Sequence, residues 1–392
     1  MNNNIARLYE ISLKKERLII GLMSGTSLDG LDIALCRIRE SGLQTKVELL
    51  EFETIPYGDD LIADIRQIFS KKQADLEKVC LLNALIGNLH AELVLACLKR
   101  WNTDPEEIDC IASHGQTIYH APKRLHKLNN YPNATLQIGD GDHIAVKTGI
   151  LTLSDFRQKH IAAGGEGAPL ALYGDYLMFS SADENRILLN MGGISNFTFL
   201  PADGDSSRII STDVGPGNTL IDLLSQKYFN VPFDKDGLIA GKGIINDALL
   251  KAMLSHDFFN EALPKTCGPE LFNLEFIEAS KAKAGVLDIA PEDLIATVTQ
   301  LTSDAIIHAL KQYDDLKLTI YTSGGGLHNP VIMHKLQSLS NASLKTTEDL
   351  GINPDAKEAI LFAVLANETL SGSSPAIGKS PAVTMGKISF PH

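Results

Sequence analysis

Apolar residues follow two different spacings along the 392 residues of the chain. Short apolar runs at 18–23, 31–38 and 47–52 are separated by turns, which predicts three successive strands. Between about residues 60 and 100 the apolar positions recur every three or four residues, which predicts helices. Further segments predict strands at 108–113 and 151–154 and a helix around 144–148.

A second cycle of the same kind begins near residue 186. The pattern predicts strands at 186–191, 195–200, 208–211 and 317–321, and helices at 219–228, within 246–313 and at 354–368. Each half thus opens with strands that end in glycine-rich turns and closes with helices. This arrangement predicts an α/β fold of two domains with a ligand cleft between them, the first at 16–150 and the second at 151–392.

The charge balance narrows the range of partners. With 35 Lys and Arg against 48 Asp and Glu, the formal net charge is −13. Such a surface repels phosphate backbones and anionic lipids, so we expect neither a nucleic-acid nor a membrane partner. A phosphorylated ligand must instead be held by local backbone amides and a metal ion.

The five cysteines show no CxxC pair and no Cys/His spacing of a zinc site, which is typical of a reduced cytosolic protein. The N-terminus has no apolar segment of signal-peptide length, and nowhere do 18 apolar residues run together. We therefore expect a cytoplasmic protein without a transmembrane helix.

The strand-turn-strand sequence GLMSGTSLDGLD is the strongest local signal of a binding site. Gly25 permits a tight turn, and Thr26 and Ser27 add hydroxyls beside exposed amides, a combination that can wrap phosphate oxygens. Asp29 and Asp32 can hold a hydrated Mg²⁺, which prefers a few carboxylates together with water and phosphate oxygens. The alternative is a plain hairpin turn with solvated aspartates.

Two more glycine turns follow predicted strands. LLNMGGISN contains Gly192 and Gly193, and TSGGGLHNP contains Gly324, Gly325 and Gly326. Glycines at strand ends allow a ligand to approach the backbone closely, although each turn alone is as well explained by structure. Three such turns in one chain favour nucleotide binding.

Asp213 lies in the sequence STDVGPGN, at the end of an apolar strand and before Gly-Pro-Gly. A carboxylate in that position is a candidate general base beside a transferred phosphoryl group. The alternative is that Asp213 caps the helix that begins near Thr219. Farther upstream, Asp155 and Arg157 follow the strand at 151–154, and Arg157 can either clamp an anion or pair with a neighbour.

These motifs together resemble one known family. GLMSGTSLDGLD, SHGQTIYH, LSDFR, AAGGEGAPL, LNMGGISN, DVGPGN and SGGGLHN stand in the order found in bacterial anhydro-N-acetylmuramic acid kinases, from about residue 21 to 387. The resemblance implies the two-domain fold of the sugar kinase, Hsp70 and actin superfamily, which is ribonuclease H-like. Chains of that superfamily often return their last helix to the first domain, and the resemblance also suggests a homodimer.

The resemblance implies an activity as well. Such enzymes use ATP and Mg²⁺ to open 1,6-anhydro-N-acetylmuramic acid with water and to phosphorylate the freed oxygen, in peptidoglycan recycling. Asp213 would be the base, Gly192 and Gly193 would support phosphates, and Gly324 to Gly326 would lie under adenosine. The ATP phosphates would be held by Gly25, Thr26, Ser27, Leu28, Asp29, Gly30, Leu31 and Asp32. The sugar-side candidates are Thr117, Asp155 and Arg157.

Three positions depart from the family pattern. His160 stands where an aspartate is usual, Glu166 where glutamine is usual, and Ala171 where valine is common. Two other functions therefore stay open: a kinase for another sugar, and a non-catalytic nucleotide-dependent sensor on the same fold.

Overall fold

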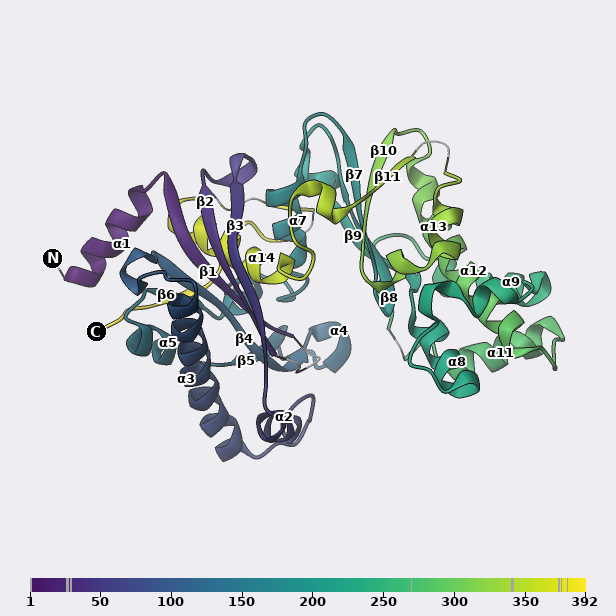
Figure 1. Ribbon diagram of the computed structural model, residues 1–392, viewed down its shortest axis with the longest axis horizontal. Helices are drawn as coiled ribbons and strands as arrows, with labels where there is room; N and C mark the ends of the chain where they lie inside the picture. Colours follow the sequence, from purple (N-terminus) through teal and green to yellow (C-terminus); the bar gives the residue numbers. More distant parts are fainter. Residues whose placement is uncertain are drawn as a thin grey trace. The chain divides into compact units, whose positions relative to one another are not determined.

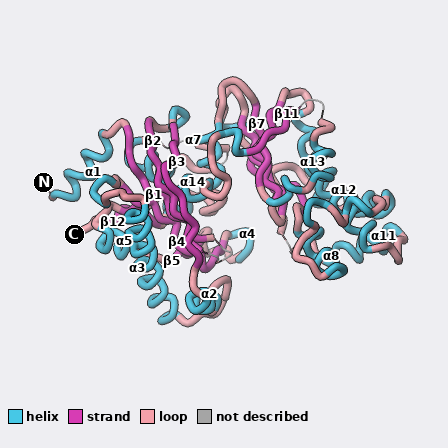
Figure 2. Tube along the Cα trace, viewed as in Figure 1, coloured by secondary structure: helices cyan, strands magenta, loops and turns pink. Residues whose placement is uncertain are grey.

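The computed structural model describes residues 2–25, 28, 30–268, 270–339, 342–372, 374, 376–378 and 380–392. The chain divides into two compact units, which we call unit 1 (Met1–Phe179 and Asp355–His392) and unit 2 (Ser180–Pro354). Each unit has its own β-sheet together with helices (Figure 1; Figure 2). The predicted α/β class, with one sheet in each half, is confirmed.

Unit 1 is built on a seven-stranded sheet in the order β12-β6-β4-β1-β2-β3, with β5 paired to β4. β1 pairs antiparallel with β2, and β2 with β3, whereas β4 and β6 continue the sheet in parallel from β1. The three strands predicted first along the chain lie in β1, β2 and β3. The strands are β1 (Glu16–Ser24), β2 (Gly30–Arg39), β3 (Lys46–Pro56), β4 (Cys110–Ala121), β5 (Ala134–Ile138), β6 (Thr152–Ser154) and β12 (Lys387–Ser389).

The last long helix of the chain covers the centre of this sheet. It packs on β1, β2 and β4, and it lies so close to β1 that a Cβ on Gly21 would be 1.9 Å from the carbonyl oxygen of Ala359. The α-helices of unit 1 are α1 (Asn3–Leu13), α2 (Asp59–Arg66), α3 (Leu76–Arg100), α4 (Lys123–His126), α5 (Gly141–Thr148), α6 (Phe156–Ala162), α7 (Ala171–Phe179) and α14 (Lys357–Ser371). Two 3₁₀ turns, η1 (Gly42–Gln44) and η2 (Pro105–Glu107), complete the unit.

Among the helices that the structure describes, α3 alone is long and apolar enough to cross a membrane. The sequence analysis did not single this helix out, because small and polar residues interrupt its apolar run. One face of α3 is nevertheless buried in unit 1, through Leu82, Ile86 and Val94 among others, and the helix packs against α5. That packing is typical of a core helix of a globular unit.

The domain boundary predicted after residue 150 differs from the observed division. β6 pairs with β4 and β12, so the chain stays in unit 1 until Phe179. Residues 355–392 then return to unit 1 and supply α14 and β12. The pairing partners of β6 lie far away in the sequence, which explains why local patterns misplaced the boundary.

Unit 2 repeats the topology of unit 1. Its sheet has the order β11-β10-β7-β8-β9, with β7, β8 and β9 antiparallel and with β10 and β11 parallel to β7. The same arrangement of three antiparallel and two parallel strands occurs in β3-β2-β1-β4-β6. The strands are β7 (Asn185–Met191), β8 (Ile194–Leu200), β9 (Ile210–Pro216), β10 (Leu318–Ser323) and β11 (Ala342–Thr346). The predicted similarity of the two halves is thus visible in strand order.

Most predicted elements of unit 2 are present. The strand predicted at 208–211 is displaced, because Arg208 belongs to a 3₁₀ turn and β9 begins at Ile210. The α-helices are α8 (Thr219–Phe229), α9 (Asp247–Leu254), α10 (Asp257–Asn260), α11 (Leu274–Ala284), α12 (Pro291–Leu310) and α13 (Pro330–Leu336). The 3₁₀ turns are η3 (Ser206–Arg208), η4 (Lys235–Gly237), η5 (Ala240–Lys242), η6 (Lys311–Tyr313), η7 (Gly325–His328) and η8 (Thr347–Leu350).

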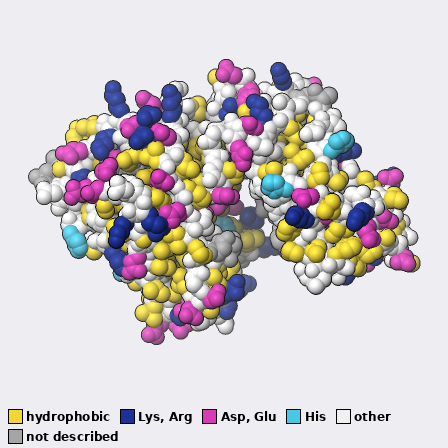
Figure 3. Space-filling model, viewed as in Figure 1, with side chains coloured by type: hydrophobic (Ala, Val, Ile, Leu, Met, Phe, Trp, Pro, Cys, Tyr) yellow, Lys and Arg dark blue, Asp and Glu magenta, His cyan; other side chains and the backbone are white. Residues whose placement is uncertain are grey.

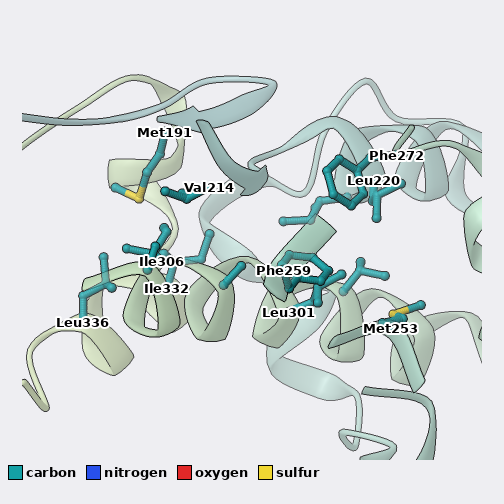
Figure 4. Packing of buried hydrophobic residues seen from close by; sticks show 14 of the residues in the cluster. Met191, Val214, Leu220, Met253, Phe259, Phe272, Leu301, Ile306, Ile332 and Leu336 are labelled. Atoms are coloured by element: carbon teal, nitrogen blue, oxygen red, sulfur yellow. The ribbon is translucent and has the colours of Figure 1, made fainter. Parts of the chain in front are cut away.

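The core of unit 2 forms around α12, which begins with a proline at its first turn and buries most of its length. In Figure 4, Ile306 of this cluster lies near the strand residues Met191 and Val214, and Leu301 lies beside Phe259. These buried side chains fix the position of the strand ends that carry the candidate site.

At the surface, acidic and basic side chains are interspersed over the visible face of both units (Figure 3).

Candidate functional site

The predicted phosphate-binding turn joins β1 to β2 in unit 1. Thr26, Ser27 and Asp29 lie outside the described residues. Gly25 follows β1, and its carbonyl oxygen accepts a hydrogen bond of 3.4 Å from the N–H of Leu28, whose side chain is buried in the core. The turn is thus tied to unit 1 at both of its described positions.

The remaining residues of this motif belong to β2. Gly30 lies against β3, where a Cβ would be 2.4 Å from the carbonyl oxygen of Ile55. Leu31 is fully buried in the core of unit 1. Gly30 allows close packing of β2 on β3, and Leu31 forms part of the core. The motif therefore contains both the predicted binding turn and residues that fix the strand beside it.

Asp32 interacts electrostatically with a second carboxylate that the sequence analysis did not identify. Its Oδ1 accepts a hydrogen bond of 2.6 Å from the Thr54 hydroxyl. Burial raises the pKa of Glu358 on α14, and the charge of Asp32 raises it further. Two neighbouring carboxylates are a donor set that suits a hydrated Mg²⁺ bound to phosphate oxygens. Because Glu358 lies far from Asp32 in the sequence and in no motif, only the fold reveals the pair.

Arg157, on α6, is held by contacts inside unit 1. Its Nε donates to Nε2 of His114 at 2.9 Å, and its Nη1 donates to the carbonyl oxygen of Gly167 at 2.8 Å. Burial, and then the positive charge of Arg157, lower the pKa of His114 to about 3, so the histidine is neutral and accepts the bond. Of the two roles considered for Arg157, pairing with neighbours is the one observed.

The other two sugar-side candidates lie near a cavity of about 420 Å³ in unit 1. Asp155 lines it and forms an ion pair with Lys387 of β12. Thr117 accepts a hydrogen bond of 3.0 Å from Gln137, which also lines the cavity. Neither Thr117 nor Arg157 lines the cavity itself, but each bonds to a lining residue, Thr117 to Gln137 and Arg157 to His114, so the structure brings all three candidates to the same side of unit 1.

In unit 2, the turn after β7 and the start of α8 form one glycine-rich cluster. The backbone N–H groups of Gly217 and Asn218 donate to the carbonyl oxygens of Gly193 and Gly192, each at 2.8 Å. A Cβ on Gly217 would lie 2.2 Å from the carbonyl oxygen of Gly192. Backbone can approach this closely only where side chains are absent.

The third glycine turn packs on the end of the same strand. Gly324 follows β10 with φ 81° and ψ 169°, a conformation open only to glycine. A Cβ on Gly324 would be 2.7 Å from Oδ1 of Asn190, and one on Gly326 would be 2.6 Å from Cβ of Met191. Gly325, between them, faces Asn218. The structure therefore gathers Gly192, Gly193 and Gly324 to Gly326 at the carboxyl ends of β7 and β10, where α/β sheets bind ligands.

Asp213 lies within β9, and a separate segment of chain holds it. Its Oδ2 accepts a hydrogen bond of 2.9 Å from the N–H of Cys267, and its own N–H donates to the carbonyl oxygen of Lys265 at 3.0 Å. The alternative role of Asp213 as a helix cap is wrong, because Asn218 occupies the N-cap position of α8. The carboxylate is thus a partly exposed group fixed in orientation by backbone.

Comparison with known proteins identifies the family. The sequence profile of the anhydro-N-acetylmuramic acid kinases matches residues 17–390. A protein of that name from Pseudoalteromonas translucida (strain TAC 125) is 51% identical over 399 residues, with 100% of both chains covered. The chain belongs to the anhydro-N-acetylmuramic acid kinase family. Another protein of that name, from Caldanaerobacter subterraneus subsp. tengcongensis, is 41% identical over 394 residues, covering 98% of this chain and 100% of its own.

A solved structure, the activator of 2-hydroxyisocaproyl-CoA dehydratase from Clostridium difficile with bound ADPNP, aligns with a TM-score of 0.41. Its sequence identity is 12%, and the alignment covers 90% of this chain and 96% of that chain. The likeness is too loose to carry an argument, so family membership rests on sequence.

His160, which the sequence analysis set apart from the family pattern, has a structural role. It is buried on α6, and its Nδ1 accepts a hydrogen bond of 2.9 Å from the N–H of Gly167. Its ring packs edge-on against Tyr173, and a Cβ on Gly165 would lie 2.2 Å from the ring. His160 therefore holds the glycine-rich loop that follows α6.

Lys265 anchors the segment that holds Asp213. Its buried ammonium donates to the carbonyl oxygens of Phe258 at 2.7 Å and Phe259 at 3.3 Å, and it lies 4.4 Å from the centre of the Phe258 ring. The backbone N–H of Lys265 donates to the Thr212 hydroxyl at 3.0 Å. Lys265 lies in the loop between α10 and α11, and a loop lysine carries no sequence signal of this role, because the contacts form only once α10 and β9 meet.

Proposed function

We propose that this protein is an ATP-dependent kinase that opens 1,6-anhydro-N-acetylmuramic acid and yields N-acetylmuramic acid 6-phosphate. Membership of the family supports the substrate and the reaction. The structural observation that carries the proposal is the carboxylate of Asp213, whose Oδ2 is fixed by the Cys267 N–H at the glycine-rich end of the unit 2 sheet.

The chemistry assigned to Asp213 is that of a general base. It takes a proton from water as the water oxygen bonds to the anomeric carbon of the sugar. The bond from that carbon to the 1,6-bridging oxygen breaks, and this oxygen then takes the γ-phosphoryl group of ATP, releasing ADP. A carboxylate held by backbone needs no reorganisation during the step.

The nucleotide is assigned to the glycine turns. Gly25, Leu28 and Asp32, with the neighbouring residues of the β1–β2 motif, would hold the phosphates, supported by Gly192 and Gly193. Gly324 to Gly326 would lie under adenosine. When bound, Mg²⁺ would neutralise negative charge on the phosphates. The carboxylates of Asp32 and Glu358 are candidate ligands for the ion, and Asp29 is a further candidate.

The sugar is assigned to the side of unit 1 that carries Thr117, Asp155 and Arg157. The cavity of about 420 Å³ beside Asp155 supports this assignment, because its size is within the range of small-ligand pockets. We further propose a cytoplasmic homodimer that acts in peptidoglycan recycling and amino-sugar metabolism, on the strength of the family and of the cysteine pattern.

The deciding experiment is a coupled ADP-release assay with Mg-ATP. It compares 1,6-anhydro-N-acetylmuramic acid, N-acetylmuramic acid and N-acetylglucosamine as acceptors. We expect release with the anhydro sugar alone and its loss in Asp213→Asn. Asp315→Asn, which changes an exposed aspartate of the same unit, is the matched control. Faster turnover of an ordinary sugar, or full activity of Asp213→Asn, would refute the proposal.

A further inference from the structure

Four buried side chains form a continuous hydrogen-bonded chain in unit 1. Nε2 of His90 lies 2.8 Å from the hydroxyl of Tyr57, and that hydroxyl donates to Oγ of Ser24 at 2.9 Å. The Ser24 hydroxyl donates to Oε1 of Gln116 at 2.6 Å. The members come from α3, the segment after β3, the end of β1, and β4. The chain thus crosses the interior of the unit.

The hydrogen bonds of this chain run in one direction. The amide nitrogen of Gln116 can only donate, so its Oε1 must accept from Ser24. Ser24 therefore accepts from Tyr57, and Tyr57 accepts from a proton on Nε2 of His90. Burial lowers the pKa of His90 to about 4, which keeps the ring neutral, and its Nδ1 has no partner in the described part of the chain. One tautomer of His90 satisfies every link.

The chain ends on the backbone of the phosphate turn. Nε2 of Gln116 donates to the carbonyl oxygen of Gly25 at 3.1 Å. The same carbonyl oxygen also accepts the longer bond, of 3.4 Å, from the N–H of Leu28 inside the turn. Because glycine adopts many backbone conformations, the orientation of this peptide unit needs an external constraint.

We infer that His90, Tyr57, Ser24 and Gln116 are positioning residues for nucleotide binding. They hold the Gly25 carbonyl toward the interior of unit 1, which keeps its partial negative charge away from nucleotide phosphates. The inference rests on the proposed function, in which this turn binds ATP. None of the four residues needs to touch the nucleotide.

The test compares two buried tyrosines of unit 1. Tyr57→Phe breaks the chain at its centre, whereas Tyr173→Phe removes one buried hydrogen bond, of 2.7 Å to the carbonyl oxygen of Pro381. We expect Tyr57→Phe to weaken ADP binding, measured by calorimetry, by about 3- to 10-fold, the range for one hydrogen bond. KM for ATP should rise by a similar factor, while KM for the sugar stays within about 2-fold. Tyr173→Phe should leave both unchanged.

A second variant and a mutant cycle extend the test, and Ser24→Ala alone still tests the inference if Tyr57→Phe folds poorly. Ser24→Ala breaks the same chain, so the double variant with Tyr57→Phe should bind ADP about as weakly as either single variant. Unchanged ADP affinity in both folded single variants, or additive losses in the double variant, would overturn the inference alone. Wild-type protein that binds no nucleotide would overturn the proposed function and this inference with it.

Discussion

Acidification should destabilise unit 1 through two buried histidines. Burial is the main cause that lowers the pKa of His90 to about 4 and that of His114 to about 3, from a reference value of 6.5. In the unfolded chain both rings bind a proton below pH 6.5, whereas in the folded unit they stay neutral until pH 4 or lower. The unfolded state therefore binds more protons in this window, and the free energy of unfolding falls as the pH falls.

The size of the effect follows from the two pKa values. Each fully shifted histidine changes the free energy of unfolding by about 1.4 kcal/mol per pH unit. Together the two rings should remove on the order of 5 kcal/mol between pH 7.5 and 4.5. The raised pKa values of Glu358 and Glu368 act in the opposite sense, because those carboxyls take up protons first in the folded state. A comparison of variants is therefore more informative than the total slope.

The chain contains a built-in probe for this measurement. Its single tryptophan, Trp101, follows α3 and packs against the core of unit 1. Urea unfolding followed by Trp101 fluorescence at several pH values thus reports on the unit that holds both histidines. His90→Gln keeps a donor to Tyr57 but cannot titrate, so its slope between pH 6.5 and 4.5 should be shallower by about 1.4 kcal/mol per unit.

His334→Gln, which changes an exposed histidine on α13 of unit 2, serves as the control. It should leave the slope seen by Trp101 unchanged. If His90→Gln has the same slope as the wild type, the buried histidine does not titrate as its environment requires, and the reasoning is refuted.

Two further variants probe unit 2. Lys265→Met should lower kcat about 10-fold with little change in KM, because the segment that carries the Cys267 N–H would no longer be anchored beside Asp213. Steady-state kinetics measure both constants. An unchanged kcat would exclude Lys265 as an anchor of this segment. Gly324→Ala should raise KM for ATP at least 10-fold, because its Cβ would meet Asn190 Oδ1 at 2.7 Å. Gly351→Ala also has a positive φ but open space around it, and it should leave KM for ATP unchanged.

The sequence predicted the elements whose signals are local. The apolar runs of β1 to β3 and the helical spacing of α3 are read directly from neighbouring residues. α1 was missed because it depends on distant contacts. It packs against α14, and the side-chain amide of Asn4 donates to the carbonyl oxygen of Pro391 at 2.9 Å.

The candidate site shows the same division. Motifs identified Asp213 and the glycine turns, because glycines and a strand-end carboxylate stand out in sequence. Glu358 and Lys265 were missed, since each reaches the site from another element and sits in an ordinary helical or loop context. The sequence identified Arg157 as a candidate, but its hydrogen bonds to His114 and Gly167 could not be predicted, because these partners lie in other segments of unit 1.

The interrupted course of unit 1 has a consequence for synthesis. Unit 2 is translated in full before α14, although nascent domains usually fold in order from the N-terminus. Until residues 355–392 emerge, the face of β1 that Gly21 presents to Ala359 has no helix upon it. The nascent first unit therefore stays incomplete, with an apolar face of its sheet exposed, until α14 has been made. A chain truncated after Pro354 would contain a complete unit 2 joined to an aggregation-prone unit 1.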